Sequence, residues 1–216
     1  MIDVGLMKAD DGRLIIPVER MLQHGVEGYL FGDLESMATE IVSKPIGAVG
    51  YPMVMAVLAG SELLGAMTST VKQSDRIESY WAKYMAQVDW HYGHLGVIAK
   101  ELARNGIAHS YLSDLGVLVQ RGGGRHFMRS GGELIFDCLQ LDVDFRRSYT
   151  EYALPYILDN RADAQRGLDA LFKHDLEKAS MVANLPAELF PDVLTPIDGH
   201  TTPIYVRQDP PWETED

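Results

Sequence analysis

Three residues within the short segment 104–109 have side chains suited to phosphate chemistry: Arg104, Asn105 and His109. A histidine titrates near neutral pH, so His109 can accept or donate a proton. An arginine carries a permanent forked cation that can hold a phosphate as its charge shifts, and an asparagine can orient the imidazole or a phosphate oxygen. These roles match RNA cleavage by transesterification, in which a base deprotonates the 2′-hydroxyl and an acid protonates the leaving oxygen.

One segment resembles the signature of HEPN ribonucleases, an Arg-Asn pair followed by a histidine; it reads Arg104-Asn105-Gly106-Ile107-Ala108-His109. The resemblance covers at most residues 46–111, and the hexapeptide is its specific element. It implies a helical bundle, a homodimer in which two motifs share one cleft, RNA as the substrate, and cleavage without a metal or another cofactor. HEPN-like bundles also place a carboxylate of the preceding helices near the motif, so we expect Glu62 to pair with Arg104 at the substrate site. The run 102–145 is in addition similar to a group of uncharacterised bacterial proteins, which implies no function.

The spacing of the motif is not specific by itself, since Arg121 and His126 repeat it in a glycine-rich turn. The hexapeptide differs because it includes an asparagine and lies in a predicted helix, where a bend at Gly106 is needed to align its ends. In the alternative interpretation, Arg104 forms a surface ion pair and His109 caps a helix. The chain is then a non-catalytic helical protein that binds a partner protein or a small ligand.

The overall charge argues against nonspecific binding to nucleic acid or to anionic membranes. With 19 Lys and Arg against 31 Asp and Glu, the formal charge is −12, and phosphate binding needs clustered cations. An RNA site therefore requires a local basic patch. Five arginines lie close together in the chain, and we expect the first two to contact the substrate, with solvated loop arginines as the alternative: Arg121, Arg125, Arg129, Arg146 and Arg147.

Other constellations indicate neither a metal site nor secretion. His91 and His94 lie three positions apart, but no third ligand at a matching spacing stands out, so we expect no metal. The single cysteine, Cys138, excludes an internal disulfide and lies in an apolar run, as expected of a buried residue in a reducing compartment. No basic region leads into an apolar stretch at the N-terminus, so we expect a cytoplasmic protein.

The elements that must position these residues are mostly helical. Residues 46–67 contain one charge, Glu62, together with four glycines and Pro52, and we interpret them as a buried core helix rather than a membrane span. Helical periodicity predicts further helices at residues 75–88 and 90–111, the second of which holds the motif. Their aromatic side chains exceed what one small bundle readily buries, so we expect them at the dimer interface: Trp81, Tyr84, Trp90 and Tyr92.

The remainder of the chain divides into an arm, an insertion, two helices and a tail. Residues 1–45 mix short β-like pieces with turn signals and predict an irregular N-terminal arm. Strands separated by glycine turns predict a small antiparallel sheet inserted near residues 116–141. Helices complete a core domain of residues 46–182, and residues 183–216 predict a proline-rich extended tail. The expected fold class is mainly α, a HEPN-like helical bundle with a small inserted antiparallel β-sheet.

Overall fold

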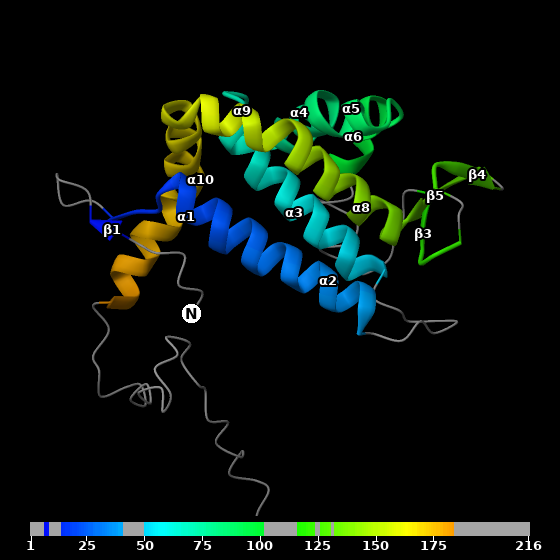
Figure 1. Ribbon diagram of the computed structural model, residues 1–216, viewed down its shortest axis with the longest axis horizontal. Coiled ribbons are helices and arrows are strands. Elements are labelled where there is room, and N and C mark those ends of the chain that lie inside the picture. Colours follow the sequence, from blue (N-terminus) through cyan, green and yellow to red (C-terminus); the bar gives the residue numbers. More distant parts are fainter. Residues whose placement is uncertain are drawn as a thin grey trace, which may run out of the picture.

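The computed structural model describes most of the bundle and its sheet. The described residues are 7–8, 14–40, 50–101, 116–123, 126–130 and 132–183. Within them helices dominate, and a small three-stranded sheet lies at one end of the bundle (Figure 1). The prediction of a mainly α fold is therefore confirmed.

A short strand pair and a long helix come first. β1 (Met7–Lys8) pairs antiparallel with β2 (Leu14–Ile15). α1 (Val18–Arg20), η1 (Met21–Leu30), which is π-helical, and α2 (Phe31–Thr39) then follow one another without a break. Together these three elements form one helix along the side of the bundle (Figure 1).

This helix corrects the prediction that residues 1–45 form an irregular arm, which is wrong for residues 18–39. Gly25, Gly28 and Gly32 lower the intrinsic helix propensity, and Gly32 with Asp33 reads as a turn signal in the sequence. The segment is nevertheless helical, because a helix buries its apolar stripe in the core. The stripe consists of Val18, Met21, Leu22, Val26 and Leu34.

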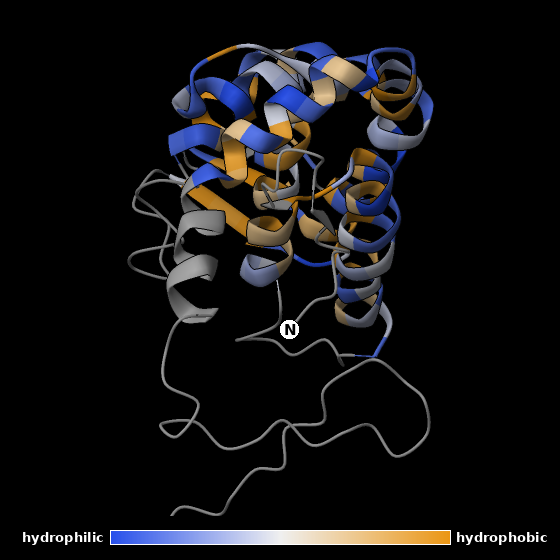
Figure 2. Cartoon of the chain, turned by 90° about the vertical axis from the view of Figure 1, so that its left-hand side faces the viewer, coloured by the Kyte–Doolittle hydropathy of each residue, from blue (hydrophilic) through white to orange (hydrophobic). Residues whose placement is uncertain are grey.

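The predicted core helix at residues 46–67 corresponds to α3 (Gly50–Thr68), the central helix of the bundle. α3 packs against α4 (Arg76–Tyr80), α8 (Cys138–Ser148) and α10 (Arg161–Ala183). Its length and apolar composition are those of a membrane span, but 61% of its most apolar window is buried inside the bundle. Figure 2 shows the same trend, with hydrophobic stretches gathered in the interior and hydrophilic ones on the outer turns.

The second predicted helix is also present. η2 (Gln73–Asp75) leads into α4, which continues as η3 (Trp81–Met85) and α5 (Ala86–Val88). After a turn, the chain enters α6 (Tyr92–Glu101), which packs against α4 and η3. The rest of the third predicted helix lies outside the described residues.

The aromatic residues expected at a dimer interface are mostly buried within a single chain. Trp81, Tyr84 and Tyr92 are 1%, 4% and 0% exposed, whereas Trp90 is 65% exposed. Trp81 and Tyr92 pack edge to face with their ring centroids 5.2 Å apart. One bundle therefore buries three of these four rings, and their aromatic surface does not support these helices as the interface.

The sheet has a different strand order from the one predicted. β5 (Glu133–Asp137) lies in the centre, between β3 (Val117–Gln120) and β4 (Met128–Ser130). β4 pairs antiparallel with β5, but β3 pairs parallel with it, so the expected antiparallel sheet is wrong for this pair. The chain crosses from one edge of the sheet to the other between β3 and β4, and the β3–β5 pairing buries Val117 and Phe136 in the core.

The central strand is followed directly by a long helix. β5 ends at Asp137 and α8 begins at the next residue, so the sheet ends before residue 141, where its end was predicted. η5 (Tyr149–Ala153) and α9 (Leu154–Asp159) continue α8 before α10 completes the bundle. Cys138 is fully buried, as expected, and its burial raises the pKa of the thiol to about 11. The proline-rich stretch predicted to form the tail lies outside the described residues.

Candidate functional site

The six predicted site residues divide into two groups. Arg104, Asn105, His109 and Arg125 lie outside the described residues, so the predicted pairing of Arg104 with a carboxylate stays a prediction. The other two, Glu62 and Arg121, have defined surroundings, which show what each side chain contacts.

Arg121 lies just after β3 and contacts the N-terminal helix. Its Nη2 donates a hydrogen bond to the carbonyl oxygen of Ala38, 2.7 Å away, in the last turn of α2. Carbonyl groups in a final helical turn lack an intrahelical partner and favour a nearby cation. Arg121 therefore joins the sheet to the N-terminal helix, and its predicted contact with a substrate stays a prediction.

The end of α6 that precedes the motif is fixed to the start of the neighbouring helix. Lys100 Nζ lies 2.8 Å from Asp75 Oδ1 and 3.7 Å from Glu78 Oε2. The hydrogen bond from Lys100 lowers the pKa of the Asp75 carboxyl. On the same 3-10 turn as Asp75, Gln73 Nε2 donates to Glu62 Oε1 of α3 at 3.4 Å. Glu62 and the end of α6 therefore lie at the same end of the bundle.

The residue after Asp75 is a buried arginine. Arg76 is 8% exposed, its Nη1 has no hydrogen-bond partner, and it takes part in none of the ion pairs among the described residues. Its main chain packs tightly against α3, because a Cβ at Gly65 would overlap the Arg76 carbonyl group. Since buried charges are normally paired, this end of the bundle carries a positive charge that the described residues do not compensate.

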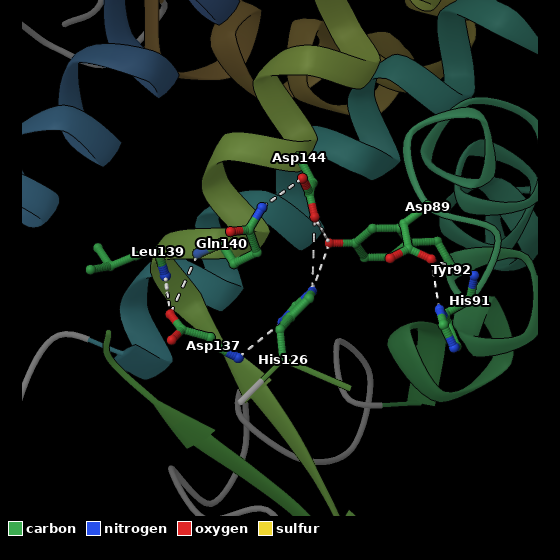
Figure 3. A network of polar contacts seen from close by, with 8 residues as sticks. All are labelled: Asp89, His91, Tyr92, His126, Asp137, Leu139, Gln140 and Asp144. Atoms are coloured by element: carbon green, nitrogen blue, oxygen red, sulfur yellow. Dashed lines mark hydrogen bonds and ion pairs between the residues drawn. The ribbon is translucent and has the colours of Figure 1, made fainter. Parts of the chain in front are cut away.

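A second polar cluster joins the sheet to the helices, and sequence reasoning missed it (Figure 3). Tyr92 Oη on α6 donates to Asp144 Oδ2 on α8 at 2.8 Å, and it lies 2.9 Å from Nε2 of His126, which precedes β4. Gln140 Nε2 donates to the other Asp144 oxygen at 2.9 Å. Tyr92 is 34 positions from His126 and 52 from Asp144 in the chain, so no motif spacing could reveal the cluster.

The contacts of His126 define its protonation state. Its Nδ1 accepts a hydrogen bond from the main-chain N–H of Asp137 at 3.1 Å, so the proton of the neutral ring lies on Nε2 and is donated to Tyr92. Burial lowers the pKa of His126, and this effect outweighs the nearby carboxylates of Asp144 and Asp137, which raise it. Both ring nitrogens are engaged within the protein, so we interpret His126 as a structural residue rather than an acid or base.

The Asp137 carboxylate organises the turn and the helix around it. It accepts hydrogen bonds from the main-chain N–H groups of Gly122, Gly123, Leu139 and Gln140 at 3.1, 2.8, 3.0 and 3.4 Å. Burial raises the pKa of this carboxyl, but the four hydrogen bonds outweigh burial and leave the pKa below its usual value. Asp137 is therefore both the N-cap of α8 and the anchor of the glycine turn after β3.

An open pocket of about 310 Å³ lies beside the cluster. Because main-chain donors already surround the Asp137 carboxylate, the lining offers neutral hydrogen-bonding groups and apolar carbon rather than a strong free charge. Such a lining suits a small polar molecule. The lining residues are Gly122, His126, Asp137, Leu139, Gln140 and Val143.

An aromatic stack lies close to the cluster. The rings of Trp90 and His91 stack with centroids 3.9 Å apart, and His91 stacks on Phe127 at 5.3 Å. His91 Nδ1 lies 2.7 Å from Asp89 Oδ1. His94 of α6 packs edge to face on Trp90, with ring centroids 5.6 Å apart. In the part of the chain that the structure describes, no three His, Cys, Asp or Glu residues are grouped as metal ligands.

No model of a known family, no curated protein and no solved structure matches this chain.

Proposed function

We propose that this chain is a metal-independent ribonuclease of the HEPN type that acts as a cytoplasmic homodimer. Arg104 holds the scissile phosphate, His109 acts as acid or base, and Asn105 orients the imidazole or a phosphate oxygen. The resemblance of the hexapeptide suggests these roles.

The observation that carries the proposal is the ion pair between Lys100 and Asp75. It fixes the end of α6, and the hexapeptide begins three residues after Glu101, the last described residue of that helix. Three residues of chain reach at most about 11 Å, and the end of α6 lies at the same end of the bundle as Glu62. This arrangement supports a carboxylate of a preceding helix near the motif, as the resemblance implies.

Cleavage of RNA by transesterification needs two proton transfers and stabilisation of the negative charge on the pentacoordinate phosphorus. One His109 removes the proton of the 2′-hydroxyl, the oxygen attacks phosphorus, and the bond from phosphorus to the 5′ oxygen breaks as that oxygen gains a proton. In a dimer with a shared cleft, the two copies of His109 supply the base and the acid. Arg104 compensates the charge that develops on the phosphate oxygens. The products are a 2′,3′-cyclic phosphate and a 5′-hydroxyl.

The test is cleavage of a labelled single-stranded RNA by the purified full-length chain at near-neutral pH. His109→Ala should lower the rate roughly 10²-fold or more, the usual scale for a positioned acid or base, and Arg104→Ala should lower it comparably. A chelator should have no effect. His24→Ala is the matched control, because this histidine is exposed on η1, far along the chain from the motif.

Two results would defeat the ribonuclease proposal. One is no cleavage at all by a protein that light scattering shows to be dimeric, and the other is unchanged cleavage in both the Arg104 and His109 variants. His126→Ala, which shares the spacing of the motif, is a poor control because its ring is held by Asp137 and Tyr92.

A second candidate is a non-catalytic protein that binds a small ligand, and the pocket beside Asp137 favours it. The net charge of −12 also suits this function better than RNA binding. Val143 lines the pocket and is 55% exposed, so Val143→Trp should fill the pocket without disturbing the core. If a panel of small polar molecules raises the melting temperature of the wild type and not of Val143→Trp, the binding function is supported.

A further inference from the structure

Among the described residues, Arg76 is buried and its Nη1 has no hydrogen-bond partner, and this arrangement requires an explanation. Arginine is a permanent cation in proteins, so the cost of burying one is relieved by an anionic or hydrogen-bonding partner. The neighbouring carboxylates are already engaged, since Asp75 accepts from Lys100 and from Ser74, and Glu78 also lies close to Lys100. Arg76 Nη1 is left without an acceptor.

The position of Arg76 is imposed by tight packing. Gly65 has no side chain, and this allows the main chain of Arg76 to approach α3 so closely that a Cβ at position 65 would overlap it. The arginine therefore starts α4 at a fixed place, directly after Asp75, which binds the end of α6. The uncompensated cation is thus held next to the residue that binds the end of α6.

We propose that Arg76 is an anion-binding residue that receives a phosphate group of the RNA backbone. The proposal rests on the proposed ribonuclease function for the identity of the ligand. Arginine suits this task because its planar fork matches two oxygens of a phosphate. A local cation of this kind also gives an acidic protein a place for a polyanion, since Lys100 is already paired with carboxylates.

Arg76→Gln tests the proposal through stability, because it keeps much of the side-chain volume and removes the charge. In a buffer without phosphate or sulfate, the variant should unfold at the same temperature as the wild type or higher, since it no longer buries an unpaired charge. Adding inorganic phosphate should raise the melting temperature of the wild type and not of Arg76→Gln. Arg166→Gln is the matched control, because Arg166 is exposed on α10 and paired with Asp163, and it should respond as the wild type does.

A 2′-deoxy oligonucleotide serves as the second probe, since it carries the phosphates and lacks the attacking hydroxyl. Arg76→Gln should weaken its binding about tenfold and reduce the slope of log affinity against log salt by about 0.7, the value for one phosphate contact to a single strand. In RNA cleavage, the same variant should raise KM more than it lowers kcat, whereas Arg76→Lys should restore part of the affinity.

The outcomes separate this proposal from the proposed function. If Arg76→Gln loses oligonucleotide binding while the wild type cleaves no RNA, the anion site stands and the ribonuclease proposal fails. If cleavage and the phosphate response are the same in Arg76→Gln as in the wild type, the anion site fails and the ribonuclease proposal stands. Strong destabilisation or misfolding of Arg76→Gln in the phosphate-free buffer would also overturn the anion site, because it would mean that a carboxylate of the chain already neutralises the arginine.

Discussion

The hydroxyl of Tyr92 donates to Asp144 Oδ2 at 2.8 Å, and this one hydrogen bond joins α6 to α8 inside the core. Tyr92 is fully buried and Asp144 is 7% exposed. The same hydroxyl accepts from His126, which is fixed by the main chain of β5. The helix that leads to the proposed catalytic segment is therefore tied to both the sheet and α8 through a single side chain.

Tyr92→Phe removes the donor to Asp144 and the acceptor for His126 in one step. Because it leaves two buried polar groups each short of a partner, we expect a loss of about 1–3 kcal/mol in the free energy of unfolding. Tyr29→Phe is the control, since Tyr29 is 39% exposed on η1, and it should change stability by no more than about 0.5 kcal/mol. Urea unfolding measures both, and equal stabilities of the two variants would show that the hydrogen bonds of Tyr92 contribute nothing.

Two glycines in helices should respond to alanine in opposite directions. A Cβ at Gly167 of α10 would overlap the carbonyl oxygen of Ala66 in α3, so Gly167→Ala should destabilise the protein by about 1–3 kcal/mol. A Cβ at Gly32 of α2 has no atom within 4 Å, so Gly32→Ala should stabilise it by about 0.5–1 kcal/mol. Thermal unfolding decides between them, and a shift of the same sign in both variants would contradict this view of the α3–α10 contact.

Asp137 should tolerate asparagine better than alanine. Asp137→Ala leaves four main-chain N–H groups without an acceptor and should cost about 2 kcal/mol or more. Asp137→Asn keeps one side-chain oxygen and should lose less. Chemical unfolding of both variants measures the difference. If asparagine and alanine cost the same, the hydrogen bonds of this carboxylate are not what holds the turn after β3 to the start of α8.

The main helices could be predicted from the sequence because burial repeats along them at helical spacing. Ile77, Trp81, Tyr84 and Met85 mark such a face in residues 75–88, and all four are buried. The N-terminal helix could not be predicted, because Gly25, Gly28 and Gly32 disfavour a helix and Gly32-Asp33 suggests a turn when they are considered locally. Only the rest of the core, which packs on Val26 and Leu34, makes that segment helical.

The sheet and the polar cluster depend on contacts that local patterns do not contain. Glycine turns predict hairpins between neighbouring strands, whereas the parallel pairing of Val119 with Phe136 joins strands that are not neighbours in the chain. The cluster likewise combines residues from α6, the turn before β4 and α8. By contrast, the hexapeptide is a local signal that the sequence shows directly, and the structure adds the placement of the helix that leads to it.

The last prediction concerns pH and follows from the contacts of His126. Its pKa is lowered in the folded protein, because burial disfavours the charged ring and outweighs the nearby carboxylates of Asp144 and Asp137, which raise the pKa. Above about pH 6.5, the usual pKa of histidine, neither the folded nor the unfolded chain binds this proton, and His126 gives stability no pH dependence. As the pH falls below that value, the unfolded chain takes up the proton first, so the folded protein loses stability until the pH passes the lowered pKa.

His126→Asn isolates this effect, because its side-chain oxygen can replace Nδ1 as the acceptor for Asp137 and does not titrate. We expect the free energy of unfolding of the wild type to fall more steeply than that of the variant between pH 6.5 and about pH 5, by up to about 1.4 kcal/mol per pH unit for one proton. The two proteins should show the same dependence between pH 7 and 8. Urea unfolding at half-unit intervals measures both curves. Parallel curves across the acidic range would mean that His126 is protonated as easily in the folded chain as in the unfolded one, and the neutral ring assigned to the Tyr92–Asp144 cluster would be wrong.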